Sequence, residues 1–265
     1  MNILEIAGLS ASVCVGISLG LIGGGGSILT LPILVYLLHI NPVTSSAYSL
    51  FVVGTTSLVG AITYMRQRQV DYRVALVFSV PSFVAVYTSR HYLLPAIPES
   101  LGVVGSLTLT RNGVIMVLFS LLMLGAALSM IRGQGCVGTP ARSEGLKLPL
   151  IAAEGALVGL LTGLVGAGGG FLIIPALVLL ARLPMKIAVG TSLLIIAVKS
   201  LIGFTGDLSH VAIDWSFLLR FTLLSVTGIF IGSHLSRYIS GARLKKSFGY
   251  FVLLLGVYIL LREVS

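Results

Sequence analysis

Apolar residues recur along this chain in long runs that are separated by short polar stretches. A run of about 18 residues or more can cross a bilayer as a helix, because the hydrocarbon core is roughly 30 Å thick. The pattern predicts an all-α integral membrane protein with about ten membrane-inserted segments. We expect these segments at about residues 3–22, 27–38, 43–64, 72–88, 112–131, 148–166, 170–181, 186–206, 214–234 and 247–262.

Two of the predicted segments, 27–38 and 170–181, are too short to cross a bilayer. As a helix, each would reach roughly 18 Å, which is well below the thickness of the hydrocarbon core. We therefore expect one half-helix or re-entrant segment in each half of the chain.

An internal repeat relates the two short segments. The stretch GLIGGGGSILTLP, from Gly20 to Pro32, aligns without gaps on GLVGAGGGFLIIP, from Gly163 to Pro175, at an offset of 143. Chance apolar similarity would not keep glycines, prolines and serines in register. We expect one membrane domain over 1–265, with a first repeat at about 1–135 and a second at about 144–265.

Small residues occur at every fourth position in the segment before each glycine cluster. They are Ser12, Gly16 and Gly20 in the first repeat and Gly155, Gly159 and Gly163 in the second. Small residues at this spacing let helix backbones approach closely. We expect them to serve helix packing rather than binding.

With five segments per repeat, an odd number, the second copy enters the membrane upside down relative to the first. The basic residues agree with two inverted repeats, because they gather in four stretches on one predicted side. These stretches are 66–73, 132–147, 182–186 and 237–246, whereas Arg90, Arg111 and Arg262 lie on the other side. Since basic loops stay in the cytoplasm, we expect both termini outside the cell.

Composition excludes a water-soluble fold. Charged residues make up 9% of the chain and hydrophobic residues 56%, whereas soluble domains carry about 25% charged residues. The lipid bilayer is therefore the expected surrounding. The formal net charge of +9 comes mainly from segment ends, so no nucleic-acid partner is expected.

The glycine clusters at the start of the short segments are the first candidate site. A helix N-terminus offers unpaired N–H groups and partial positive charge, and glycine lets an oxyanion approach the backbone closely. The competing interpretation is a tight kink between helices. The candidate residues are Gly23, Gly24, Gly25, Gly26, Ser27, Gly166, Gly168, Gly169 and Gly170.

Lys199 is the sharpest single candidate, because a cation at mid-membrane costs about 2.5–3.5 kcal/mol and usually has a function. Ser192 lies on the same helical face as Lys199, and Ser49 and Thr56 form the equivalent face of the first repeat. We expect Lys199 to balance the charge of an anionic substrate. The alternative is a structural contact, with Glu154 or with a helix-terminal carbonyl.

Three further charged residues are weaker candidates. Arg220 is a substrate-binding candidate, but it lies close enough to the outer boundary at Asp214 to extend its side chain there. Glu154 and Asp207 are candidates for proton coupling. For Asp207, His210 and Asp214, capping of helix ends at the outer surface is the favoured interpretation.

The sequence lacks the patterns that would indicate an enzyme. It contains no H-E-x-x-H motif and no His/Cys cluster that could hold a metal. The glycine clusters lack the Lys-Ser/Thr of a phosphate-binding loop. We therefore expect no catalytic residue, metal or cofactor.

Two segments carry a resemblance to a known family. GLIGGGGSILTLPILVYLLHINP and GLVGAGGGFLIIPALVLLARLPMKIAVGTSLL resemble the two signature segments of the TauE/SafE sulfite exporter family. Members are small bacterial and archaeal permeases associated with export of sulfite, sulfoacetate and other small sulfur-containing anions. The resemblance implies a multi-pass protein of the cell membrane. The first motif has Ser27 where the second has Gly170, so the two halves differ.

These observations predict a secondary transporter that exports sulfite or an organosulfonate, by alternating access around a site at the midplane. A passive anion channel, and a non-transporting membrane scaffold or enzyme, are the alternatives. The expected partners are the small anion and the bilayer, and a homodimer stays open.

The inverted arrangement makes a prediction about topology. Reporter fusions in the 66–73 and 237–246 stretches should both report the cytoplasmic side, because both stretches are rich in arginine or lysine. A fusion at the C-terminus should report the opposite side. If the two basic stretches lie on opposite sides, the arrangement is wrong.

Overall fold

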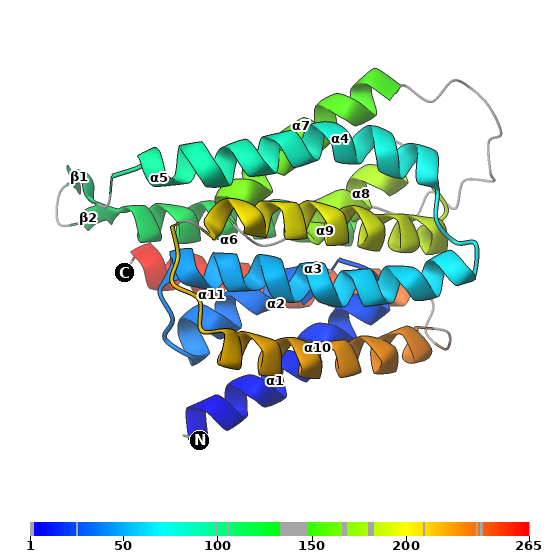
Figure 1. Cartoon of the computed structure of the whole chain (residues 1–265), viewed down its shortest axis with the longest axis horizontal. Helices are drawn as coiled ribbons and strands as arrows, with labels where there is room; N and C mark the ends of the chain where they lie inside the picture. The colour runs from blue at the N-terminus through cyan, green and yellow to red at the C-terminus, as the bar shows by residue number, and fades with distance from the viewer. Residues whose placement is uncertain are drawn as a thin grey trace.

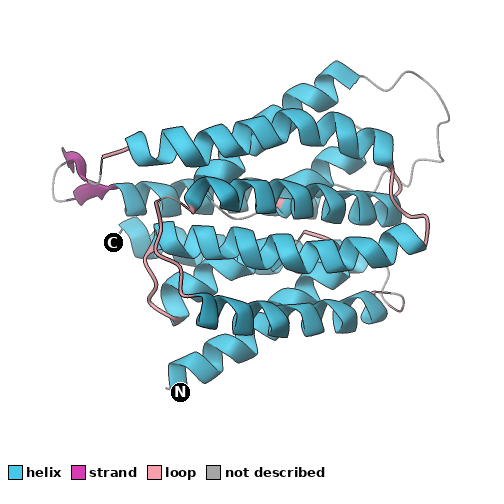
Figure 2. Cartoon of the chain, viewed as in Figure 1, coloured by secondary structure: helices cyan, strands magenta, loops and turns pink. Residues whose placement is uncertain are grey.

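The computed structural model describes residues 3–24, 26–98, 100–104, 107–132, 148–165, 169–179, 183–208, 210–236, 238 and 241–264. Helices make up almost all of this part of the chain, with one antiparallel hairpin (Figure 2). The elements of the first half are α1 (Ile3–Ile22), α2 (Gly26–Pro32), η1 (Ile33–Leu37), α3 (Pro42–Arg66), α4 (Tyr72–Thr88), η2 (Ser89–Leu93), α5 (Leu94–Ala96), β1 (Ser100–Val104), β2 (Leu107–Thr110) and α6 (Arg111–Arg132). Those of the second half are α7 (Leu148–Val165), α8 (Gly170–Leu179), α9 (Met185–Asp207), α10 (Trp215–Leu235) and α11 (Gly241–Val264).

The predicted segments agree closely with these helices, and the two short segments are confirmed as short. The segment after α1 consists of the 7 residues of α2 and the 5 of the π-helix η1, and α8 has 10 residues. Among the described residues, five helices are long and apolar enough to cross a membrane by length and composition. They are Pro42–Arg66, Tyr72–Ala96, Arg111–Ser129, Lys186–Asp207 and Trp215–Leu235.

The region after Thr88 differs from the prediction, which ended the helix there and placed a loop before residue 112. The helix instead continues through η2 and α5 to Ala96, and the β1–β2 hairpin follows. Arg90 interrupts the apolar run and so suggested a loop. In the structure its charge is paired inside the protein, and the helix can continue.

Polar side chains fix where several long helices begin. Asn41 accepts a hydrogen bond from the Val43 N–H at 2.9 Å, and Asp71 accepts from the Arg73 N–H at 3.0 Å. Asp214 accepts from the Phe217 N–H at 3.1 Å, so its predicted capping role is confirmed. These side chains satisfy N–H groups that have no partner within the helix.

The helices lie side by side as a bundle, with α3 and α9 next to each other at its centre (Figure 1). The helix pair α4 and α7 lies on the α9 side, and the pair α1 and α10 lies on the α3 side. We call the end that carries β1 and β2 the hairpin end, and the opposite end, with the α3–α4 turn, the turn end. Both termini lie toward the hairpin end in Figure 1.

Two hydrogen bonds tie loops to the central helices at the two ends. At the turn end, the Asp71 N–H donates to Thr191 Oγ1 at 2.9 Å. At the hairpin end, the Asp214 N–H donates to Tyr48 OH at 2.7 Å. Each bond joins the cap of one outer helix to the first turns of a central helix.

The small residues at every fourth position pack as predicted. A Cβ at Gly16 would overlap the carbonyl of Ser225, and one at Gly20 would lie 2.5 Å from the Ile229 oxygen. The helices α7 and α4 pack equally closely, because a Cβ at Gly159 would lie 2.5 Å from the Ser82 oxygen. Glycine therefore sets how closely α1 approaches α10 and α7 approaches α4.

This close packing predicts a stability effect. Gly16→Ala should lower the free energy of unfolding by about 1–3 kcal/mol, because the added methyl group overlaps the backbone of α10. Gly125→Ala on α6 is the matched control, since nothing lies within 4 Å of its Cβ position. Denaturant titration of both variants in detergent measures the difference. Equal stability of the two variants would contradict the packing argument.

Candidate functional site

The two glycine segments lie against each other inside the bundle. Gly23 ends α1 with a φ of +78°, and Gly169 precedes α8 with a φ of +69°. A Cβ at Gly170 would lie 2.6 Å from the Gly24 Cα, so the two backbones are in contact. The two helix breaks therefore meet inside the bundle.

Other residues of the glycine segments are placed only in part. Gly26 begins α2, and a Cβ there would overlap the Val15 carbonyl of α1, so this glycine serves packing. Gly25, Gly166 and Gly168, and the side chain of Ser27, lie outside what the structure describes.

Lys199 brings a positive charge to this meeting point. It is 0% exposed, and its Nζ donates a hydrogen bond to Thr162 Oγ1 at 3.0 Å. A Cβ at Gly169 would lie only 2.6 Å from the same Nζ. The ammonium group therefore lies directly beside the start of α8, where a helix also carries partial positive charge. Two adjacent positive features favour a negative partner.

The sequence analysis missed Thr162. Its hydroxyl also donates to the Val158 carbonyl at 2.7 Å, so it can hold the ammonium group in place from α7. The repeat could not reveal this role, because the equivalent position in the first repeat is Leu19.

The alternative ion pair between Lys199 and Glu154 is not formed. Within the described residues, no ion pair joins Lys199 to any carboxylate, and Glu154 lies half-buried on α7. A buried cation without a carboxylate partner is costly unless another group compensates its charge. The positive charge of Lys199 is thus free to pair with an anion that enters from outside the protein.

Buried hydroxyl groups line the two central helices. Ser192 Oγ on α9 contacts the Val189 carbonyl at 2.8 Å and the Gly23 carbonyl at 3.3 Å, which links it to the first glycine segment. Ser49 and Thr56 on α3 are buried, and their hydroxyls have no hydrogen-bond partner among the described residues. Such groups are available donors.

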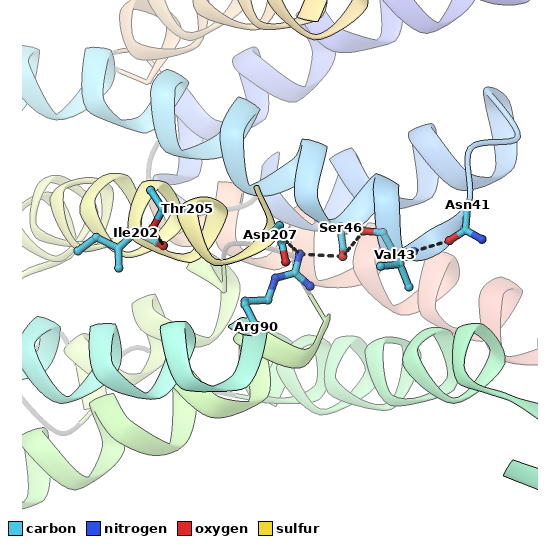
Figure 3. A network of polar contacts seen from close by, with 7 residues as sticks. All are labelled: Asn41, Val43, Ser46, Arg90, Ile202, Thr205 and Asp207. Atoms are coloured by element: carbon cyan, nitrogen blue, oxygen red, sulfur yellow. Dashed lines mark hydrogen bonds and ion pairs between the residues drawn. The ribbon is translucent and has the colours of Figure 1, made fainter. Parts of the chain in front are cut away.

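The prediction that Asp207 caps a helix at the surface is wrong. Its carboxylate is 3% exposed and lies 2.6 Å from Arg90 Nη2, and the same nitrogen donates to Ser46 Oγ at 2.8 Å (Figure 3). Arg90, expected in an outer loop, is 0% exposed. The two charges are distant in sequence and come together only when η2 packs on α9.

Arg220 lies apart from the Lys199 cluster. Its side chain is exposed on α10 and donates to the Ser216 carbonyl at 2.9 Å and to Ser216 Oγ at 3.2 Å. The structure therefore groups Lys199, Thr162 and the glycine segments, but not Arg220.

Comparison with known proteins shows the family of this chain. The family model "Sulfite exporter TauE/SafE" matches residues 8–259. The chain belongs to the TauE/SafE family. This family consists of membrane transporters rather than enzymes, and we conclude that the chain is a multi-pass membrane transporter of a small solute.

Curated relatives cover most of the chain. A "Probable membrane transporter protein" of Xylella fastidiosa (strain 9a5c) is 29% identical over 94% of this chain and 92% of its own length. The "Probable membrane transporter protein YunE" of Bacillus subtilis is 31% identical over 90% of this chain and 88% of its own. No solved structure matches this chain.

Because Lys199 is buried without a carboxylate partner, removing its charge should not destabilise the protein. Lys199→Met should leave the free energy of unfolding unchanged or raise it by up to about 3 kcal/mol, because it removes an unpaired charge from the interior. Lys186→Met, which changes an exposed lysine of the same helix, should have no effect. Thermal unfolding in detergent compares them. A clear loss of stability confined to Lys199→Met would mean that Lys199 holds the fold together.

Proposed function

We propose that this chain is a secondary transporter that exports a small sulfur-containing oxyanion, such as sulfite or an organosulfonate. One observation carries the proposal: the ammonium group of Lys199 is fully buried beside Gly169, where the two glycine segments meet, and has no carboxylate partner in the described chain. A small anion bound at this point would balance the positive charge of Lys199. The family description agrees with this class of substrate.

In the proposed site, Lys199 balances the substrate charge and Thr162 orients Lys199. The backbone N–H groups of the segments 24–27 and 166–170 bind the oxyanion oxygens. The Gly23 N–H is not among these donors, because it donates to the Leu19 carbonyl at 2.7 Å. The hydroxyls of Ser49, Thr56 and Ser192 add donors from the central helices. Backbone and hydroxyl donors suit an oxyanion because they bind several oxygens at once without a second full charge.

We further propose that two inverted halves alternate the access to this site. In support, the repeat offset of 143 relates α1 to α7 and α4 to α10. The packed pair α1–α10 therefore corresponds to the packed pair α7–α4 in the other repeat. The same shift relates the Asp71–Thr191 hydrogen bond at the turn end to the Tyr48–Asp214 bond at the hairpin end. Repeats with this relation can open toward either side around one site.

A secondary transporter also needs a group that carries the coupling ion and a defined orientation in the membrane. Glu154 on α7 and Asp207 on α9 are carboxylates of membrane-inserted helices, so either can carry a coupling proton. The turn end faces the cytoplasm because it carries basic residues such as Arg66 and Arg73. The hairpin end, with both termini, then faces the outside of a bacterial or archaeal cell membrane.

The transport proposal predicts the behaviour of purified protein in vesicles. Proteoliposomes should take up sulfite in a saturable manner, and Lys199→Ala should reduce uptake at least about 100-fold, because the substrate charge is then uncompensated inside the membrane. Lys186→Ala is the control and should transport normally. Radiolabelled sulfite uptake, with and without a pH gradient, measures both.

Three outcomes would change the proposal. Equal uptake by Lys199→Ala and the control would remove Lys199 from the site. Flux far above about 10³ ions per second that ignores a pH gradient would indicate a passive channel. The absence of any anion flux in wild-type vesicles would indicate a scaffold or an enzyme.

A further inference from the structure

Arg90 is the second fully buried cation, and its hydrogen-bonding capacity is only partly used. Its Nη2 atom serves both Asp207 and Ser46 (Figure 3). Its Nε and Nη1 atoms are buried and donate to no described residue. A guanidinium carries five N–H donors in a planar fork that matches an oxyanion. The buried Arg90 side chain therefore keeps unused donors of the kind that bind oxyanions.

Arg90 also covers the face of α9 that continues from Lys199 toward the hairpin end. Lys199, Gly203 and Gly206 share one face of α9. A Cβ at Gly203 would lie 2.6 Å from Val86 Cγ1, and one at Gly206 would lie 3.1 Å from the Arg90 Cβ. Val86 and Arg90 thus cover this glycine face. Gly206 lies seven residues after Lys199, which is about 10 Å along the helix.

We propose that Arg90 is a second anion subsite, at the hairpin-end exit of the Lys199 site, and that Asp207 occupies it until a small oxyanion displaces the carboxylate. This inference rests on the proposed transport function. The Asp207 carboxylate and the oxyanion both present oxygen lone pairs to the Arg90 guanidinium. When one replaces the other, the buried guanidinium therefore keeps a negative partner. Since the Arg90–Asp207 contact joins η2 to α9, the exchange also releases these two elements from each other.

A purely structural clamp is the competing explanation. In that case Asp207 serves only to neutralise Arg90, and removal of its charge destabilises the protein without affecting anion binding. In a subsite, by contrast, Asp207 competes with the anion. Neutralising Asp207 then strengthens anion binding, and the gain depends on Arg90.

The test is calorimetric titration of the full-length protein in nanodiscs with sodium sulfite. Asp207→Asn should bind sulfite at least about fivefold more tightly than wild type, which is the lower end of typical coupling between sites. The double variant Asp207→Asn with Arg90→Gln should lose this gain while keeping a neutral pair of similar shape. Asp214→Asn is the matched control, because it removes the same charge at the same end from an exposed position.

The outcomes separate this inference from the transport proposal. Sulfite binding that requires Lys199 but is unchanged by Asp207→Asn would overturn the Arg90 subsite alone. An equal gain in Asp214→Asn would also overturn it, since the effect would then be general electrostatics. If wild-type protein and all variants fail to bind sulfite, both the subsite and the proposed substrate are wrong.

Discussion

Lipid cannot hydrogen-bond to a polypeptide, and this constraint governs the whole structure. Inside a bilayer, every backbone N–H and C=O group must find a partner within the protein. The chain meets this requirement with helices, and its caps at Asn41, Asp71 and Asp214 serve helix ends. Where helices break, at the glycine segments, the backbones of Gly24 and Gly170 are in contact inside the bundle. The break is thus an interior feature of the bundle, which is where a polar solute could be bound.

Close helix packing surrounds that interior. Glycines on α1 and α7 let each helix touch the backbone of its partner, and these two pairs flank the central helices α3 and α9. Glycine therefore sets how closely the outer pairs pack around the centre of the bundle.

The two buried cations among the described residues have different surroundings. Arg90 has a carboxylate at 2.6 Å, so its charge is neutralised within the fold. Lys199 has only the hydroxyl of Thr162 at 3.0 Å, and the start of α8 adds further positive character. A fold under selection for stability alone would replace such a lysine with an apolar residue. The lack of a carboxylate beside Lys199 therefore supports the proposed anion site, whereas the charge of Arg90 is already balanced by Asp207.

The sequence by itself determined the membrane location, the order and approximate limits of the helices, the two short segments, and the position of Lys199 inside an apolar helix. Apolar run length, repeat register and the cost of a buried charge are local properties that can be read from one chain. Only the tertiary structure decided which distant residues meet. The sequence indicates a loop at Arg90, and only the fold shows that Asp207 lies beside it. The repeat did not mark Thr162 as a site residue, because the equivalent residue of the first repeat is Leu19. Contacts between residues far apart in sequence depend on how the helices pack, and that packing is not encoded in any local pattern.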